Sequence, residues 1–151
     1  MKSFADPSVQ RSTAERLRHL RPDSDRRWGT MTPHEMLCHL ADSLRVVLGE
    51  RPQDVRITLF SRTLMKWFAL YVPLPWPHGI RTGRTVDPRR DGTLPTEFTR
   101  DLAALQEVTA RFLARSAAMP MPHPMFGALS QAEWLRWAYL HEDHHLRQFG
   151  Q

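Results

Sequence analysis

Apolar residues recur at helical spacing in five segments of the chain, and prolines and polar loops separate these segments. In the first of them, Val9, Thr13, Leu17 and Leu20 fall on one face of a helix. No segment shows the strict alternation of apolar and polar residues that indicates a strand. The pattern therefore predicts an all-α protein with helices over residues 8–20, 32–49, 59–71, 96–117 and 130–149.

Two of these segments begin with the signature of a helix N-terminus. Thr32 is suited to be an N-cap, a proline follows it directly, and Glu35 completes a capping box. Ser130 and Glu133 form a second capping box at the start of the last segment. Gly49 is suited to end the helix that begins at Thr32.

The third segment, residues 59–71, is apolar nearly all round. A pattern at positions 60, 64, 67 or 68, and 71 persists for three turns and favours a helix. The alternative is a strand, because residues 56–60 (RITLF) have a strand-like composition. Such a helix either lies in the centre of the core or is covered by a second subunit. Because its outward face is also apolar, we expect a homodimer.

A long connection, residues 72–95, follows this segment and contains five prolines and four arginines. Structureless loops of this length are usually functional or mobile. The arginines could receive the carboxylates of a small anionic thiol, but a solvated, mobile loop is the favoured interpretation. They are Arg81, Arg84, Arg89 and Arg90.

Length and composition limit the class of protein. A chain of 151 residues with 41% hydrophobic residues is typical of one globular domain, which we take to span residues 1–151. One cysteine, Cys38, excludes a disulfide-rich scaffold. The N-terminus is polar where a signal peptide would be apolar, and no apolar run reaches the ~20 residues of a membrane span. We therefore expect a cytoplasmic protein that has no membrane contact.

The net charge of +5 does not by itself indicate a nucleic-acid partner. Arginines are scattered along the whole chain and alternate with acidic residues, and no recognisable nucleic-acid-binding motif is present. A solvated surface rich in arginine is the favoured interpretation. We therefore do not expect nucleic acid to be a partner.

The last segment contains two histidines, His141 and His145, one helical turn apart. They point in the same direction and continue the apolar stripe of Trp134 and Trp137, so they face inward. Two stacked imidazoles on the core side of a helical bundle are suited to bind a first-row metal ion. The alternative is a pair of core histidines, but each would then need burial and its own hydrogen-bond partner.

The same residues spell H-E-x-x-H, the zinc-protease signature, in which Glu142 would be the general base. The few residues after His145 include no further ligand, so a third ligand must come from upstream. The best candidate is His39, which shares the buried side of the second helix with Met36 and Leu40. Cys38, about 100° round the helix from His39, is expected to be a small buried residue and not a ligand.

Other polar residues are candidates for supporting roles. Glu142 and His144 are candidate catalytic groups, although a solvated carboxylate and an edge hydrogen bond are the plainer expectations for them. Asp42 and Ser43 could fix the tautomer of His39. His34 and His19 are expected to be exposed. The candidates for contact with a substrate are His78 and His123 in the two proline-rich loops, and Gln148 on the last helix.

Two motifs are similar to those of the DinB/YfiT-like superfamily of metalloenzymes. WGTMTPHEMLCHLADSL resembles its second-helix motif, and HEDHHLRQF resembles its last-helix motif of two histidines four apart followed by a glutamine. WPHG and HPMFGALSQAEW look like a branch of the superfamily that has no assigned function. The resemblance extends from Arg21 to the end of the chain.

The resemblance implies a four-helix bundle of up-down-down-up topology, here with a short extra N-terminal helix. It also implies one divalent metal ion, zinc or nickel, held by His39, His141 and His145 at one end of the bundle. Relatives in the superfamily include S-transferases that use bacillithiol, mycothiol or glutathione, and hydrolase-like or isomerase-like proteins. Dimers are common among them.

The hypothesis from the sequence is a metal-dependent S-transferase or hydrolase that acts on a small molecule, with a low-molecular-weight thiol as a possible cofactor. A metal ion with three neutral ligands could lower the pKa of bound water or thiol. The alternative is a non-enzymatic metal-binding or stress-related interaction protein, which would use the same three histidines.

Overall fold

The helices of the structure begin close to where the sequence predicts them. The computed structural model describes residues 1–55, 57–115, 117 and 119–151. Within these residues it contains five α-helices, a π-helical turn and a 3₁₀ turn, and no strand, so the predicted all-α class is confirmed. The elements are α1 (Pro7–His19), α2 (Pro33–Val47), η1 (Ser61–Met65), α3 (Lys66–Tyr71), η2 (Arg84–Val86), α4 (Phe98–Ala114) and α5 (Gln131–Gln148).

Both predicted capping boxes are present. The Thr32 hydroxyl accepts a hydrogen bond from the backbone N–H of Glu35, whose carboxylate accepts one from the N–H of Thr32. Ser130 and Glu133 make the same reciprocal pair at the start of α5. These bonds satisfy backbone donors that have no partner within the helix. The sequence did not identify the side-chain caps of α1 and α4, which are Asp6 and Glu97.

The third and fourth predicted helices can be compared with the structure at their boundaries. Leu59 and Phe60 are helical and lead through η1 into α3, so the prediction of a helix here is confirmed; residue 56 of the alternative strand lies outside the described residues. The prediction that the fourth helix extends to residue 117 is wrong, because α4 ends at Ala114. Residue 116 of that stretch lies outside the described residues.

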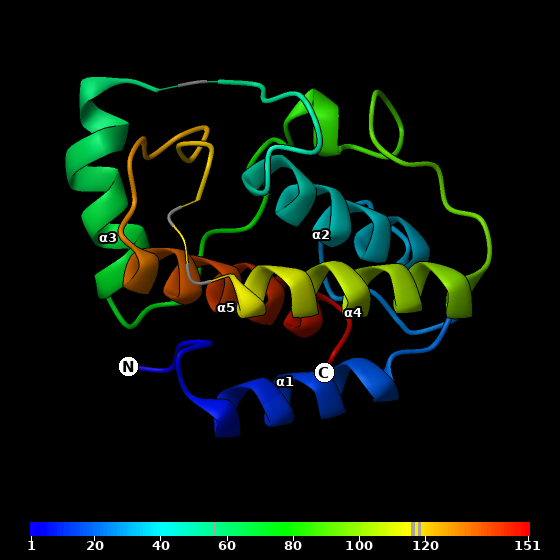
Figure 1. Ribbon diagram of the computed structural model, residues 1–151. Helices are drawn as coiled ribbons and strands as arrows, with labels where there is room; N and C mark the ends of the chain where they lie inside the picture. Colours follow the sequence, from blue (N-terminus) through cyan, green and yellow to red (C-terminus); the bar gives the residue numbers. More distant parts are fainter. Residues whose placement is uncertain (56, 116, 118) are drawn as a thin grey trace.

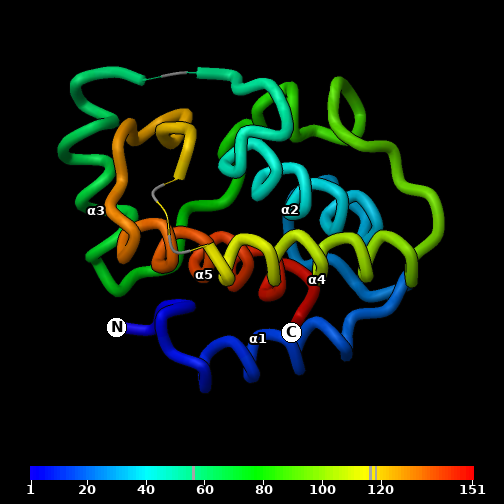
Figure 2. The backbone as a smooth tube through the Cα atoms, in the orientation of Figure 1, coloured from blue at the N-terminus to red at the C-terminus, as the bar shows by residue number. Residues whose placement is uncertain are grey.

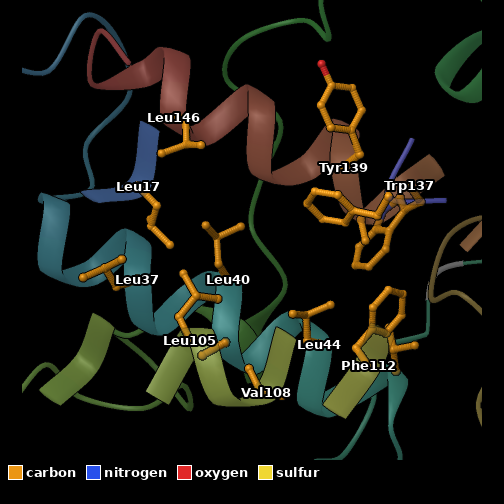
Figure 3. Packing of buried hydrophobic residues seen from close by; sticks show 14 of the residues in the cluster. Leu17, Leu37, Leu40, Leu44, Leu105, Val108, Phe112, Trp137, Tyr139 and Leu146 are labelled. Atoms are coloured by element: carbon orange, nitrogen blue, oxygen red, sulfur yellow. The ribbon is translucent and has the colours of Figure 1, made fainter. Parts of the chain in front are cut away.

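The core lies where α2 packs between α4 and α5. Contacts join α2 to α4 and α5, and α5 to α1 and α3; Figure 1 shows α3 at one end of the other helices. Burial of leucine and aromatic side chains between these helices is the main stabilising term. Figure 3 shows buried side chains of α2, α4 and α5 packed together, among them Leu37, Leu40, Leu44, Leu105, Val108, Phe112 and Leu146.

The helix formed by η1 and α3 does not lie in the centre of the core. Only Ser61 and Leu70 of these two elements are buried. Leu64 and Trp67 remain 59% and 57% exposed. The alternative of a helix in the centre of the core is therefore excluded, because α5 covers one side of this helix and its other side is open. Periodicity shows that a face is apolar but does not show what covers it.

The long connection between α3 and α4 is held against α2. Asp42, fully buried on α2, accepts hydrogen bonds from the Thr93 backbone N–H at 2.6 Å and from its hydroxyl at 2.9 Å. Arg51 donates to the backbone carbonyls of Asp91 and Thr85. Figure 2 traces this segment to η2, which contacts α2. The connection is therefore a positioned segment and not a free solvated loop.

We predict that Ser130→Ala lowers the free energy of unfolding by about 1 kcal/mol, because it removes the N-cap of α5. Urea denaturation followed by circular dichroism measures the difference. The matched control is Ser12→Ala, an exposed position inside α1, where alanine is the better helix former. Equal stability of the Ser130→Ala variant and the wild type would contradict the capping role.

Candidate metal centre

Three histidines from two helices meet at one point. One ring nitrogen of each of His39, His141 and His145 lies within 4.8 Å of the other two. The Nε2 atoms of His39 and His141 are 3.1 Å apart. All three rings meet edge to face, with centroid distances of 4.8 to 5.0 Å. The three ligands expected from the sequence are therefore together in the structure.

The arrangement follows from the helices. His141 and His145 lie one turn apart on α5 and so project from the same side. His39 lies on the buried side of α2, and α2 contacts α5. His39 is 5% exposed, whereas His141 and His145 are partly exposed. The exposed part of the cluster therefore belongs to the two residues of α5.

The hydrogen bonds around His39 and His145 fix their tautomers. The Nδ1 of His39 is 2.8 Å from the backbone carbonyl of Val86, which can only accept, so this Nδ1 carries the proton. The Gln148 amide donates from Nε2 to the carbonyl of Trp28 at 2.8 Å, which turns its Oε1 toward the Nδ1 of His145 at 2.9 Å. Both histidines therefore present an unprotonated Nε2 to the cluster when they are neutral.

Burial keeps the cluster neutral. It lowers the pKa of His39, although the hydrogen bond to Val86 opposes the shift. Burial, with the neighbouring histidines, lowers the pKa of His141 and of His145 well below the ordinary value. At neutral pH the three rings are therefore uncharged and can act as nitrogen ligands without first losing a proton.

The donor set fits a first-row divalent ion. Metal–nitrogen bonds of ~2.0–2.1 Å at a tetrahedral centre separate two ligand atoms by about 3.3 Å, close to the 3.1 Å between the Nε2 atoms of His39 and His141. Three protein ligands leave a fourth position for water or a substrate atom, as in catalytic sites. The three nearby histidines could thus bind a metal ion, whose identity imidazoles alone do not determine.

Aromatic rings surround the cluster. Trp137 stacks on His141 with ring centroids 5.1 Å apart and an interplanar angle of 24°. Trp76 lies 6.2 Å from His141, and its Nε1 donates to the carbonyl of Ala69, which fixes the ring. These rings exclude water from one side of the site, which strengthens electrostatic interactions there.

His78 and His144 lie beside the cluster. His78 is exposed and stacks on Trp28, with ring centroids 4.0 Å apart and an interplanar angle of 10°. His144 packs against Trp28 and His145. Burial lowers the pKa of His144 to about 4. The expected edge hydrogen bond of His144 is absent among the described residues, where its buried Nδ1 has no partner.

His123 does not line the cluster. It is 5% exposed and lies edge-on to Trp137, on whose ring His141 stacks. Its Nδ1 accepts hydrogen bonds from the backbone N–H groups of Met125 and Phe126. Burial lowers its pKa to about 3. The expectation of a substrate contact is therefore not supported by this geometry, which gives His123 a structural position in the second proline-rich loop.

Gln148 lies at the cluster but is already engaged. Its side chain is hydrogen-bonded to both His145 and Trp28, and the residue is 4% exposed. Its position orients His145 and does not point free polar atoms at a substrate. Gly29 permits this contact: its φ is +77°, and a Cβ there would lie 2.6 Å from the Nε2 of Gln148.

The expectation of a solvated Glu142 is wrong. Glu142 is 6% exposed, and burial raises its pKa to about 7, opposed by the charge of Arg16. It follows His141 in sequence and so lies about 100° round the helix. Together with His141 it lines a small cavity among side chains of α2, α4 and α5.

Three smaller expectations had mixed outcomes. Cys38 is buried, and burial raises its pKa to about 12, which agrees with an unreactive residue. His19 is exposed as expected, but His34 is partly buried against Phe98, so that expectation is wrong. Asp42 and Ser43 do not fix the tautomer of His39: Asp42 binds Thr93 and Arg45, and Ser43 donates to the backbone carbonyl of His39.

Three of the four loop arginines pair with acidic residues of the chain itself. Their partners are within ion-pair distance, and Arg89 makes the closest contact, at 2.6 Å to Glu35. These charges are therefore engaged within the protein and hold the loop, which disfavours a role in receiving an anionic thiol. The other two pairs are Arg84 with Asp91 and Arg90 with Asp87.

Comparison with known proteins places the chain in one group. Residues 8–151 match the model of a family described as a protein of unknown function, DUF1569. No curated protein and no solved structure matches the chain. None of the described helices is both long enough and apolar enough to cross a membrane.

We predict that the metal-free protein loses stability between about pH 7.5 and about pH 5.5. His39, His123, His141 and His145 have lowered pKa values when folded, so only the unfolded state takes up their protons near pH 6.5. Each contributes up to about 1.4 kcal/mol per pH unit. The raised pKa of Glu142 acts in the opposite direction, but it is one group against four.

Urea unfolding of chelator-treated protein at several pH values measures this dependence. The control is His19→Gln, which removes an exposed histidine and should leave the slope unchanged. A free energy of unfolding that is constant or rises as the pH falls through this range would show that the histidines are protonated in the folded state.

Proposed function

The chain belongs to the DUF1569 family of proteins of unknown function, and we propose that it is a metal-dependent enzyme acting on a small molecule. His39, His141 and His145 bind one divalent ion, zinc or nickel. The reaction joins the sulfur of a low-molecular-weight thiol to a small electrophilic substrate, with release of the thiol proton and of the substrate's leaving group, or it hydrolyses a small molecule with water as the nucleophile. The observation that carries the proposal is the convergence of the three ring nitrogens within 4.8 Å.

The tautomers support this proposal over a packing cluster. The Nδ1–H groups of His39 and His145 donate away from the cluster, so two bare nitrogens face its centre. Such nitrogens are acceptors and, if no cation lay between them, only the Nε2 of His141 could donate to them. A positive ion satisfies all three, and a set of buried polar groups without satisfied partners is costly.

The chemistry that the ion would supply is a lowered pKa of bound water or thiol, which gives a nucleophile near neutral pH. The residues around it have separate tasks. Val86 and Gln148 hold two of the rings in position. Trp76 and Trp137 exclude water from the cluster. His144 and His78, beside the partly exposed side, are the groups best placed to accept a proton from an incoming thiol or water.

We further propose that the fold is the up-down-down-up four-helix bundle of the DinB/YfiT-like superfamily. The bundle consists of α2, the helix formed by η1 and α3, α4 and α5, with α1 as the extra N-terminal helix. In support, the ligands come from the second and the last helix, as the resemblance implies. The contacts of α2 with α4 and α5 also agree with such a bundle.

We predict about one equivalent of metal in tag-free wild-type protein and much less than that in His145→Ala, because two ligands hold a divalent ion far more weakly than three. Elemental analysis after incubation with zinc or nickel gives the stoichiometry. The control is His19→Ala, an exposed histidine outside the cluster, which should retain the metal. Wild-type protein that takes up neither metal would remove the basis of the proposal.

The same samples separate an enzyme from a metal-binding protein without activity. A screen with thiol-transfer and hydrolase substrates is run on loaded, chelator-treated and reloaded protein. Turnover that is lost with the metal and restored with it supports the enzyme. Full metal occupancy with no turnover of any substrate supports the non-enzymatic alternative.

We propose that the open face of the helix formed by η1 and α3 is covered by a second copy of this chain. Its large apolar side chains are 41–80% exposed. Together their exposed area is on the order of 800 Å², which is what each partner buries in a standard protein interface. The cationic head of Lys66, at the edge of this face, is already paired with Glu133. The exposed side chains are Leu59, Phe60, Leu64, Trp67, Phe68 and Tyr71 of this helix, and Leu74 just beyond its end.

Sedimentation equilibrium should show a homodimer for the wild type and a monomer for Leu64→Glu, because a charge in the centre of an apolar interface is left without a partner. Leu94→Glu is the control, since Leu94 is 70% exposed but lies outside this helix. A monomeric wild type would contradict the proposal, and a dimer unaffected by Leu64→Glu would place the interface elsewhere.

A further inference from the structure

A small cavity lies next to the histidine cluster, among side chains of α2, α4 and α5. Its volume is about 10 Å³, which is about the room that one water molecule needs. Most of its lining is apolar, but Thr109, His141 and Glu142 contribute to it. A cavity of this size with two to four polar partners is the usual setting of a buried water molecule.

Glu142 is a buried carboxyl group that has no hydrogen bond within the described residues. It is 6% exposed. The charge of Arg16 acts on it, but the Arg16 guanidinium is bound to Asp143 at 2.7 Å. Buried polar groups are almost always hydrogen-bonded, to protein or to ordered water. Glu142 therefore needs a partner, and the cavity that it lines is where such a partner can lie.

His141 has the same need for a different reason. The Nδ1 atoms of His39 and His145 have acceptors, Val86 and Gln148 respectively. The Nδ1 of His141 has none among the described residues, although its Nε2 faces His39. A histidine that binds a metal almost always donates its second ring N–H to a carboxylate, a carbonyl or a water molecule. His141, too, lines the cavity.

We propose that one water molecule fills this cavity, accepts a hydrogen bond from the Nδ1–H of His141 and donates one to the Glu142 carboxyl group. Thr109 supplies its third partner. Glu142 is then a positioning residue, which acts on the metal ligand through the water and does not touch the metal or the substrate. Its effect on metal binding and the Nδ1–H tautomer of His141 rest on the proposed function, because without an ion the Nε2 of His141 carries the proton toward His39; the water in the cavity does not rest on it.

The water itself is tested first, in wild-type protein. High-resolution crystal structures of the metal-free and zinc-loaded forms should show one ordered water molecule in the cavity. Long-range proton–nitrogen NMR spectra of the zinc-loaded form should show His141 protonated at Nδ1. An empty cavity, or His141 protonated only at Nε2 in the zinc-loaded form, overturns the proposal.

The positioning role is tested with two variants of Glu142. Glu142→Met has a similar length and no acceptor, and should weaken zinc affinity 10- to 100-fold in competition with a chelator. Glu142→Gln keeps a carbonyl oxygen that can hold the water, and should stay within about threefold of the wild type. The spectrum of the cobalt-substituted protein should shift in the methionine variant alone. Equal zinc affinities in all three proteins overturn the positioning role.

Leu105→Val separates positioning from packing, because Leu105 lines the same cavity and carries no polar group. It should lower the stability of the protein and leave zinc affinity unchanged. If it weakens zinc binding as much as Glu142→Met does, Glu142 acts by packing and the proposal fails. If the wild type holds the water but binds no metal, the proposed function and the positioning role of Glu142 fail, while the water in the cavity stands.

Discussion

The organisation of this protein depends on keeping three buried imidazoles neutral and turned toward one point. A neutral imidazole has one donor and one acceptor nitrogen, so its orientation is undefined until the donor is engaged. The backbone carbonyl of Val86 does this for His39, and the Gln148 amide does it for His145. Each of these groups must itself be held in place. The contacts that hold Val86 and Gln148 therefore determine the orientation of the two rings.

Two loops hold Val86 and Gln148 in position, through contacts with α2 and α5. Val86 is part of η2, and the segment around it is tied to α2 through the buried Asp42 and through Arg51. The loop before α2 is tied to α5 through the Gln148 side chain and through Gly29, where a side chain would clash with it. The proline-rich connection is thus held in place around Val86, whose carbonyl accepts the hydrogen bond from His39.

The features that the sequence predicted depend on residues close together in the chain, whereas those it missed depend on residues far apart. Capping boxes and the pair of histidines one turn apart are local relations, and geometry within one helix determines them. His39 could be predicted as the third ligand because a histidine on the buried face of a helix is unusual unless it has a partner. The roles of Val86 and Trp28 depend on contacts between segments far apart in the chain, and no local pattern indicates them. For the same reason the sequence left open whether the third helix lies in the core or is covered by a second subunit, since an apolar face does not show what packs against it.

Glu142 shows why a motif is weaker evidence than a position. The letters of His141, Glu142 and His145 match a protease signature in which the glutamate faces the metal. Here it is 6% exposed and lines a cavity inside the helical core. An apolar residue at this position would make the protein more stable, because a buried carboxyl group without a partner lowers the free energy of unfolding. Here two adjacent residues of one helix, His141 and Glu142, place polar groups where a well-packed core has apolar ones. Such departures are expected at functional sites. It is therefore the burial of these polar groups, more than the letters of the motif, that makes this end of the helices the candidate functional site.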